Sequence, residues 1–297
     1  MINLNINKMK RRNFLLNSTL ASAAISAPFL LNANTSFSFP IAKVFGIQLY
    51  SVRDEMNKNP KKTLKKLSKY GYKYIEGYEG DLGLFWGMSN IEFKKYLDGL
   101  GMKMIASHCG ETDNFESFKM KCAKAAEIGV DYLICPWADG KRTVDGFKFI
   151  AETFNKCGRI AKQSGINFAY HNHGYSFEKV NGIYLQDVLM NETDKSFVDY
   201  EMDIYWLVAA GEDPIKWFDK HPDRFKYCHI KDYLKIDEKP GYESCTLGRG
   251  IIDFSTIINH GKKRGLEMLI VEQEDYRDTT QMESAKDNVS YMQNLKV

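Results

Sequence analysis

A repeating alternation between short apolar runs and longer amphipathic stretches restricts the fold of this 297-residue chain more than any other feature. From residue 43 onward the alternation occurs eight times, which is typical of parallel βαβ units. The expected strands are Val44–Leu49, Lys73–Glu76, Lys103–Ser107, Tyr132–Pro136, Asn167–His171, Phe197–Asp203, Phe225–Lys231 and Met268–Glu272. The expected helices are Pro60–Tyr70, Ile91–Leu100, Phe115–Ile128, Asp145–Ser164, Asp213–Lys220, Phe254–Arg264 and Glu283–Leu295.

The count and the length together predict one α/β domain, a (β/α)8 TIM barrel. Eight such units in about 255 residues match this fold, and no linker-like stretch divides them. Several expected helices end in glycine directly before the next strand, as at Gly71 and Gly101, which fits a left-handed C-cap. A doubly wound open sheet is the alternative, but no GxGxxG motif follows the first strand, so its dinucleotide-binding form has no support.

The N-terminal segment differs from the rest of the chain. Arg11 and Arg12 precede an apolar stretch rich in Ala, Ser and Leu, which predicts a signal peptide of the twin-arginine type. The expected segments are a signal peptide over residues 1–33, a spacer over 34–42 and the catalytic barrel over 43–297. We therefore expect the twin-arginine (Tat) export machinery as a partner and a periplasmic or otherwise exported location. Polar residues within the apolar stretch argue against an integral membrane protein.

The net charge of the chain belongs to this N-terminal segment. The sequence has 41 Lys+Arg and 38 Asp+Glu, and residues 1–42 hold four of the cations and no carboxylate. Removing them leaves 37 cations against 38 carboxylates in the body, a net charge of −1. Because a near-neutral body does not attract a phosphate backbone, we expect no nucleic-acid partner.

Most of the expected strands end in polar or ionisable residues, and this is the end of a (β/α)8 barrel that carries its chemistry. Residues two apart on a strand share a face, which groups His171 with His173, Glu201 with Asp203, His229 with Lys231, and Glu272 with Glu274. A lone histidine or carboxylate there is usually an ordinary hydrogen-bonded residue. Four such sets on consecutive strands instead predict a divalent-metal site with mixed nitrogen and oxygen ligands.

Six motifs follow one another through the body. They are Gly46–Arg53, Tyr170–Tyr175, Glu201–Trp206, His229–Asp232, Leu247–Phe254 and Val271–Glu274. In order and spacing they resemble the sugar phosphate isomerase/epimerase family of xylose-isomerase-like TIM barrels. The resemblance extends from residue 44 to residue 274, and it implies one divalent metal ion, Mn²⁺ first, with Co²⁺, Zn²⁺ or Mg²⁺ as alternatives.

The resemblance also implies the metal ligands. By position they are His171, Asp203, His229 and Glu272. His171 stands where the family usually has a glutamate, so the paired glutamates of its ketose epimerases are absent. Members with the His-Asn-His run tend to carry a further glutamate where this chain has Ser176, and Glu178 is the nearest substitute.

The implied function is a divalent-metal-dependent isomerase or epimerase that acts on a sugar or keto-sugar. The reaction removes a proton next to a carbonyl and passes through an enediolate. The alternative is a lyase or dehydratase of the same fold, for example one that cleaves a 3-keto-glycoside. The expected catalytic residues are Glu272 as the base, His173 or His108 as the partner acid, and Lys231 at the oxyanion or leaving group. The expected substrate-binding residues are Gln48, Tyr50, Arg53, Glu76, Trp137 and Arg249.

Two other classes compete with this interpretation. A nuclease on the same barrel would want a basic groove and a metal cluster, and the near-neutral body argues against it. A non-catalytic periplasmic sugar-binding protein would not need ionisable residues on four strands. We expect a neutral sugar or glycoside as substrate, and a homo-oligomer is compatible with the sequence.

Overall fold

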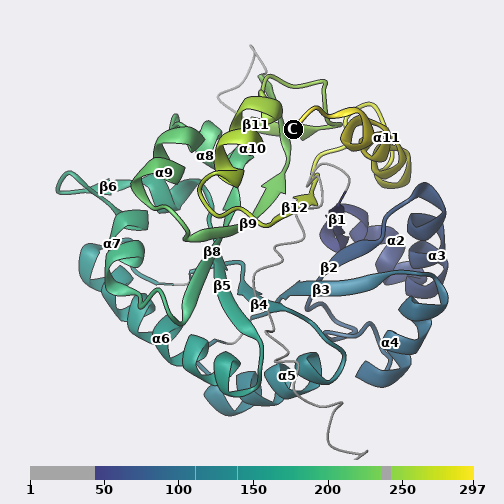
Figure 1. The fold of residues 1–297 in the computed structure, drawn as a ribbon, viewed down its shortest axis with the longest axis horizontal. Helices are drawn as coiled ribbons and strands as arrows, with labels where there is room; N and C mark the ends of the chain where they lie inside the picture. The colour runs from purple at the N-terminus through teal and green to yellow at the C-terminus, as the bar shows by residue number, and fades with distance from the viewer. Residues whose placement is uncertain (1–43, 111, 139, 236–241) are drawn as a thin grey trace, which may run out of the picture. The chain divides into compact units, whose positions relative to one another are not determined.

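The computed structural model describes residues 44–297 except 111, 139 and 236–241. The predicted signal peptide and spacer therefore lie outside the described residues. Within them, eight parallel strands close into a barrel, and helical segments follow the strands and surround the ring (Figure 1). This architecture confirms the predicted (β/α)8 barrel. No helix among the described residues is both long and apolar enough to cross a membrane.

The barrel strands follow the predicted runs to within two residues. They are β1 (Phe45–Gln48), β2 (Tyr74–Tyr78), β3 (Lys103–His108), β4 (Tyr132–Cys135), β5 (Asn167–His171), β8 (Val198–Asp203), β9 (Phe225–Ile230) and β12 (Met268–Val271). They pair in this order, and β12 pairs with β1 to close the ring. Two hairpins lie outside the barrel, β6 (Lys179–Val180) with β7 (Ile183–Tyr184), and β10 (Asp232–Lys235) with β11 (Tyr242–Cys245).

Ten α-helices lie among the described residues. They are α2 (Arg53–Lys58), α3 (Pro60–Tyr70), α4 (Asn90–Gly99), α5 (Phe115–Glu127), α6 (Val144–Gln163), α7 (Leu185–Glu192), α8 (Ile204–Ala209), α9 (Pro214–Lys220), α10 (Phe254–Lys262) and α11 (Gln281–Asn294), with 3-10 turns η2 (Leu49–Val52) and η3 (Gly174–Phe177). All but α2 and α7 begin after a residue whose side chain caps the first turn. Helix α3 shows the pattern, because Asn59 caps its start with Pro60 in the first turn. It ends at Gly71, whose φ of 117° is left-handed.

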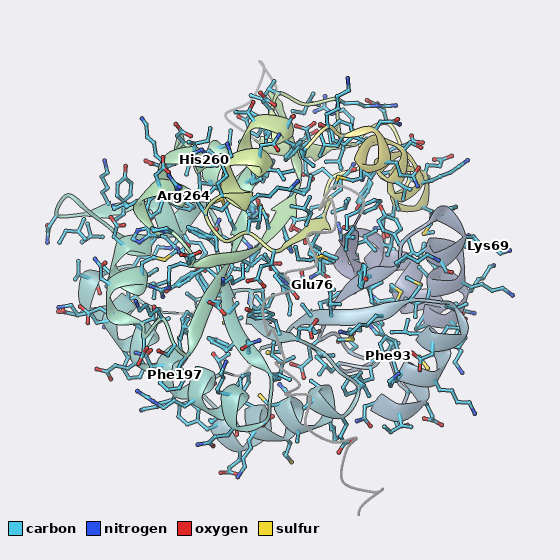
Figure 2. The ribbon with its side chains drawn as sticks, in the orientation of Figure 1. Lys69, Glu76, Phe93, Phe197, His260 and Arg264 are labelled. Atoms are coloured by element: carbon cyan, nitrogen blue, oxygen red, sulfur yellow. The ribbon has the colours of Figure 1, made fainter. Side chains whose placement is uncertain are left out.

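The inside of the barrel has an apolar part and a polar part. Ala106, Ala169, Tyr227 and Ile270 belong to a buried cluster separate from the larger core. Each of them precedes a polar residue at a strand end by two positions, so it points the same way as that residue. Glu76, one of the polar residues, lies near the centre of the ring of strands (Figure 2). The apolar cluster therefore forms a packed floor beneath the polar side chains.

This floor gives a stability prediction. Ile270 is fully buried, so Ile270→Ala leaves a cavity and should lower the free energy of unfolding by about 2–5 kcal/mol. Chemical denaturation followed by circular dichroism measures the loss. Ile251→Ala is the matched control, because Ile251 is 62% exposed. Equal losses in the two variants would contradict the packed floor.

Candidate metal centre

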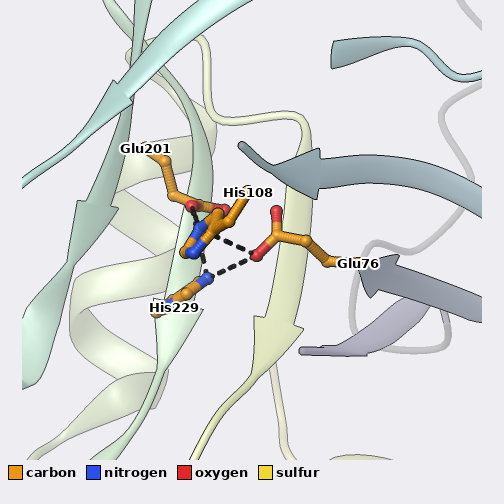
Figure 3. A group of neighbouring side chains, drawn as sticks. All are labelled: Glu76, His108, Glu201 and His229. Carbon is orange, nitrogen blue, oxygen red and sulfur yellow. Dashed lines mark hydrogen bonds and ion pairs between the residues drawn. The ribbon is translucent and has the colours of Figure 1, made fainter. Parts of the chain in front are cut away.

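Two groups of four buried side chains lie at the carboxyl ends of the barrel strands, and in each group the potential ligand atoms are within 4.8 Å of one another. The metal group consists of His171, Asp203, His229 and Glu272. The support group consists of Glu76, His108, Glu201 and His229, which point toward one another in Figure 3. The metal group is the set that sequence analysis assigned to the ion, and His229 belongs to both groups.

The ring of His229 has a different group on each side. Its Nδ1 lies 3.0 Å from Glu272 Oε2 and 3.8 Å from Asp203 Oδ2. Its Nε2 lies 2.8 Å from Glu76 Oε1 and 3.2 Å from Glu201 Oε2. An ionised carboxylate only accepts hydrogen bonds, so a proton on Nε2 satisfies the support side. A cation bound at Nδ1 takes the place of a second proton, as in metal-binding histidines whose other N–H meets a carboxylate.

Both groups have buried polar atoms without a hydrogen-bond partner among the described residues. In the support group these are the carboxylate oxygens Glu76 Oε2 and Glu201 Oε1, whereas the metal group also has an unpartnered imidazole. Asp203 Oδ2 and both ring nitrogens of His171 are buried and have no hydrogen-bond partner among the described residues. His171 Nε2 lies 3.4 Å from Asp203 Oδ2. Leaving such atoms unpaired in the interior costs free energy, and a divalent ion would satisfy Asp203 Oδ2 and one ring nitrogen of His171. Two imidazoles and two carboxylates are also a donor set that Zn²⁺, Co²⁺ and Mn²⁺ accept.

Hydrogen bonds hold Asp203 in place. Its Oδ1 accepts the backbone N–H of Trp206 and so caps α8, which leaves Oδ2 turned away from the helix. The side chain of Asn172 donates to the backbone carbonyl of Asp203 and accepts its N–H, both at 3.2 Å. The middle residue of the His-Asn-His run therefore joins the ends of β5 and β8.

The site carries more negative than positive charge. Burial raises the pKa of Glu76 to about 7, and repulsion from Glu201 adds to the effect. Burial opposes protonation of His229, but Glu201 and Glu272 outweigh it and raise the pKa of His229 well above its ordinary value. A divalent ion would supply the missing positive charge, so the electrostatics agree with the geometry.

Lys231 is a fully buried cation beside the metal group. Its Nζ lies 2.9 Å from Glu274 Oε2 and 3.3 Å from Glu272 Oε2. It also lies 4.9 Å from the ring centre of Tyr205, a cation–π contact. Burial opposes its charge, but Glu272 and Asp203 outweigh that effect and raise the pKa of Lys231, so it stays protonated.

A cavity of about 300 Å³ opens beside the metal group. Its lining includes Tyr50, His108, Trp137, His171, His173 and Glu272 from the predicted site, together with Tyr78, Glu79, Cys109, Gly110, Pro136 and Glu274. His173 Nδ1 has no partner among the described residues. Burial lowers the pKa of His173 well below its ordinary value, so the ring is neutral. No lysine or arginine is among the described residues of this lining.

Two of the residues that were predicted to bind substrate lie outside the cavity lining. Gln48 and Glu76 are fully buried and do not line the cavity. The Gln48 amide donates to Glu76 Oε1 at 2.7 Å, and its oxygen accepts the N–H of Tyr50. These contacts orient Glu76 toward His229. The same contacts fit a role in positioning the histidine, and a role in gripping substrate hydroxyls stays a prediction.

The two predicted arginines also lie away from the cavity lining. Arg53 donates to the backbone carbonyl of Glu274 at 3.0 Å and stacks 4.7 Å from the ring centre of Tyr50. Arg249 is exposed. Its loop is folded back by Asp232, whose carboxylate accepts the N–H groups of residues 248, 250 and 252. The Leu247–Phe254 motif thus has a structural explanation.

The family glutamate that Ser176 replaces has no substitute at the metal group. Ser176 Oγ lies 2.9 Å from the hydroxyl of Tyr170. Glu178 forms a half-exposed ion pair with Arg142 at 2.8 Å. The metal group therefore keeps only the four ligands named above among the described residues.

Sequence analysis placed Glu201 and Glu274 on the inward face but gave neither a role, and it gave no role to Asn172. Strand periodicity carried a signal for two of them, because Glu201 precedes Asp203 by two positions and Glu274 follows Glu272 by two. Asn172 had no such signal, since its role depends on the neighbouring strand.

A sequence model of the xylose isomerase-like TIM barrel family matches residues 64–295. The chain belongs to this family. Among curated family relatives, an inosose dehydratase of Clostridium beijerinckii is 38% identical over 87 residues, which is 29% of this chain and 28% of the relative. The match thus spans less than a third of that relative's length.

Solved structures of xylose isomerase-like proteins resemble nearly the whole barrel. A sugar phosphate isomerase/epimerase from Parabacteroides distasonis superposes with a TM-score of 0.72 and 28% identity, over 85% of this chain and 95% of that one. The IolI protein, solved with a zinc atom, gives a TM-score of 0.67 at 18% identity, over 84% and 97% of the two chains. The second likeness supports the fold alone.

The metal group predicts the effect of a nearly isosteric change. Asp203→Asn keeps an oxygen to cap α8 but loses the negative charge, so the purified protein should lose its bound divalent ion. Elemental analysis after gel filtration measures the content. Asp213→Asn is the control, because Asp213 is also the N-cap residue of a helix, α9. Unchanged metal content in Asp203→Asn would refute the ligand assignment.

The support group predicts a smaller effect. Glu201→Gln weakens the hold on His229 Nε2 without removing a ligand, so metal affinity should fall roughly 10–100-fold and not vanish. Competition with a chelator measures the affinity. A complete loss of metal would show that Glu201 is itself a ligand.

Proposed function

We propose that this chain is a metal-dependent lyase that eliminates water or an alcohol next to the carbonyl of a cyclic keto-sugar or keto-polyol. The observation that carries the proposal is the mixed His/carboxylate metal group on the wall of a cavity that also holds His173 and Glu274. Curated relatives named inosose dehydratase support elimination over the isomerisation that sequence analysis put first.

The metal would be held by His171, Asp203, His229 and Glu272. When bound there, it supplies Lewis acidity toward the substrate carbonyl. Glu272 was the predicted base, but its Oε2 already faces His229 Nδ1 and Lys231 Nζ, at 3.0 and 3.3 Å. We therefore assign Glu272 to the metal, and the base is one of the other residues that line the cavity.

His173 is the proposed base. Its ring is neutral and lines the cavity, and it packs edge-on against Trp137 with ring centres 5.0 Å apart. In this role it accepts the proton from the carbon next to the carbonyl, and the electron pair of that C–H bond forms the new double bond.

Glu274, beside the charged Lys231, is the proposed acid. Burial raises the pKa of Glu274, which favours its protonated form. It would donate its proton to the departing oxygen as the C–O bond breaks. The products are an unsaturated ketone and one molecule of water or alcohol, so atoms and electrons balance.

An isomerase or epimerase is the second candidate. It is supported by the Parabacteroides distasonis structure, which shares 28% identity and matches over 95% of its length. Both candidates begin with the same proton removal, and they differ in whether the neighbouring C–O bond breaks.

The substrate is proposed to be unphosphorylated. A phosphate group would call for arginine, lysine or a helix start in the cavity wall, and the described lining has no cationic lysine or arginine. A neutral sugar also fits the export that the N-terminal segment predicts, which we retain as part of the proposal.

Reaction in D₂O separates the candidates. The Mn²⁺-loaded protein should convert a cyclic keto-polyol or a keto-glycoside to an unsaturated ketone, detected by NMR. Deuterium uptake without loss of an oxygen substituent would instead identify an isomerase or epimerase. No change in any ketone would refute both.

Removal of the proposed base should slow the reaction without loss of metal. His173→Gln is expected to lower kcat by roughly 10²–10⁴-fold, the usual range for a general base. His260→Gln is the control, since His260 pairs with Asp219 on the surface. Wild-type kcat in His173→Gln would rule out this assignment.

A further inference from the structure

A second cavity, of about 440 Å³, adjoins the first. The two share Gly110, Pro136 and Trp137 in their linings, so Trp137 forms part of both walls. The second cavity extends along the first half of α6, to Phe149 and Phe154. None of the seven residues of the metal and support groups lines it, so the proposed metal chemistry does not account for it.

Phe149 is the unusual residue of this cavity. The neighbouring apolar residues Phe147, Ile150 and Phe154 of α6 are buried, whereas Phe149 is 70% exposed. A large aromatic residue that both lines a cavity and faces solvent exposes apolar surface to water. This exposure costs free energy until a ligand covers the residue. Packing of the helix does not explain it, because the buried positions of α6 already face the core.

Trp137 is a firm wall between the two cavities. It is 50% exposed, and its ring packs edge-on against Tyr175 with ring centres 4.7 Å apart. The Tyr175 hydroxyl accepts the backbone N–H of Ala138 at 2.8 Å, which fixes the strand-to-helix loop directly after the tryptophan. The indole is therefore held in place while much of its surface stays free for a ligand.

The second cavity also has polar groups. Thr112, Asp113 and Thr153 contribute hydroxyl and carboxylate oxygens next to the aromatic residues. No lysine or arginine is among its described lining residues. Aromatic faces beside a few hydrogen-bonding groups suit a ring with apolar C–H faces and hydroxyl edges, and they do not suit an anionic group.

We propose that the second cavity binds a second, uncharged sugar ring, joined through a glycosidic oxygen to the ketone-bearing ring beside the metal group. This inference rests on the proposed lyase function and narrows its substrate to a keto-glycoside of two sugar rings. The glycosidic oxygen is then the leaving oxygen. Its C–O bond breaks as the double bond forms, it takes the acid's proton, and the second sugar departs with a free hydroxyl.

The test compares a keto-sugar of one ring with the same keto-sugar that carries a second sugar. Phe149→Ala should lower the ratio of kcat/KM for the two-ring substrate to kcat/KM for the one-ring substrate by roughly tenfold, the effect of one lost aromatic contact. Met120→Ala is the matched control, because Met120 is 62% exposed on α5 and lines neither cavity. An unchanged ratio in Phe149→Ala would overturn the proposal.

A binding measurement separates this inference from the proposed function. Calorimetry with the unreactive parent disaccharide and its parent monosaccharide needs no turnover. Tighter binding of the disaccharide in wild type, lost in Thr153→Trp because the indole fills the cavity, supports the second site even if no substrate reacts. Equal binding of the two sugars, or tighter binding of an aryl glycoside than of the disaccharide, would contradict a sugar-ring site.

Discussion

The two-sided contact of His229 is the interaction on which the rest of the site depends. One imidazole joins β9 to carboxylates from β2 and β8 at Nε2, and to Glu272 after β12 at Nδ1. Several buried charges this close together repel one another and cost solvation free energy. The arrangement persists only if protons or a cation compensate the carboxylates. The closed barrel holds these side chains together, because its strands fix every carboxylate partner of the His229 ring at the same time.

The apolar floor makes this polar arrangement effective. Tyr227 and Ile270, two residues before His229 and Glu272, fill the interior and exclude water from that side. Charges above such a floor interact in a low local dielectric, so contacts of about 3 Å orient side chains strongly. Among the described residues, His171 and Glu272 of the metal group line the cavity, together with His173, Glu274 and Trp137. The depth of a side chain in the barrel thus decides whether it belongs to the apolar floor or to the polar site.

Most of the fold could be predicted from the sequence, because it depends on local periodicity. The choice of the four metal ligands came from the resemblance to the family, and periodicity supplied only their shared inward face. Strand alternation located His171, Asp203, His229 and Glu272 on inward-facing positions. It could not give the distance of a residue from the cavity, which depends on how the strands are staggered. For that reason the sequence did not show that Gln48 and Glu76 lie outside the cavity lining. The fold-back of the loop at Arg249 depends on Asp232, a partner distant in sequence, and no local pattern reveals it.

Location of the bound ion tests the central claim most directly. An anomalous difference map from crystals of the Zn²⁺-loaded protein would show the ion relative to the two nitrogens of His229. We predict one peak among the four metal-group side chains, about 2.0–2.1 Å from His229 Nδ1. A peak at Nε2, between Glu76 and Glu201, would contradict the account, and so would a loaded protein with no peak at either nitrogen.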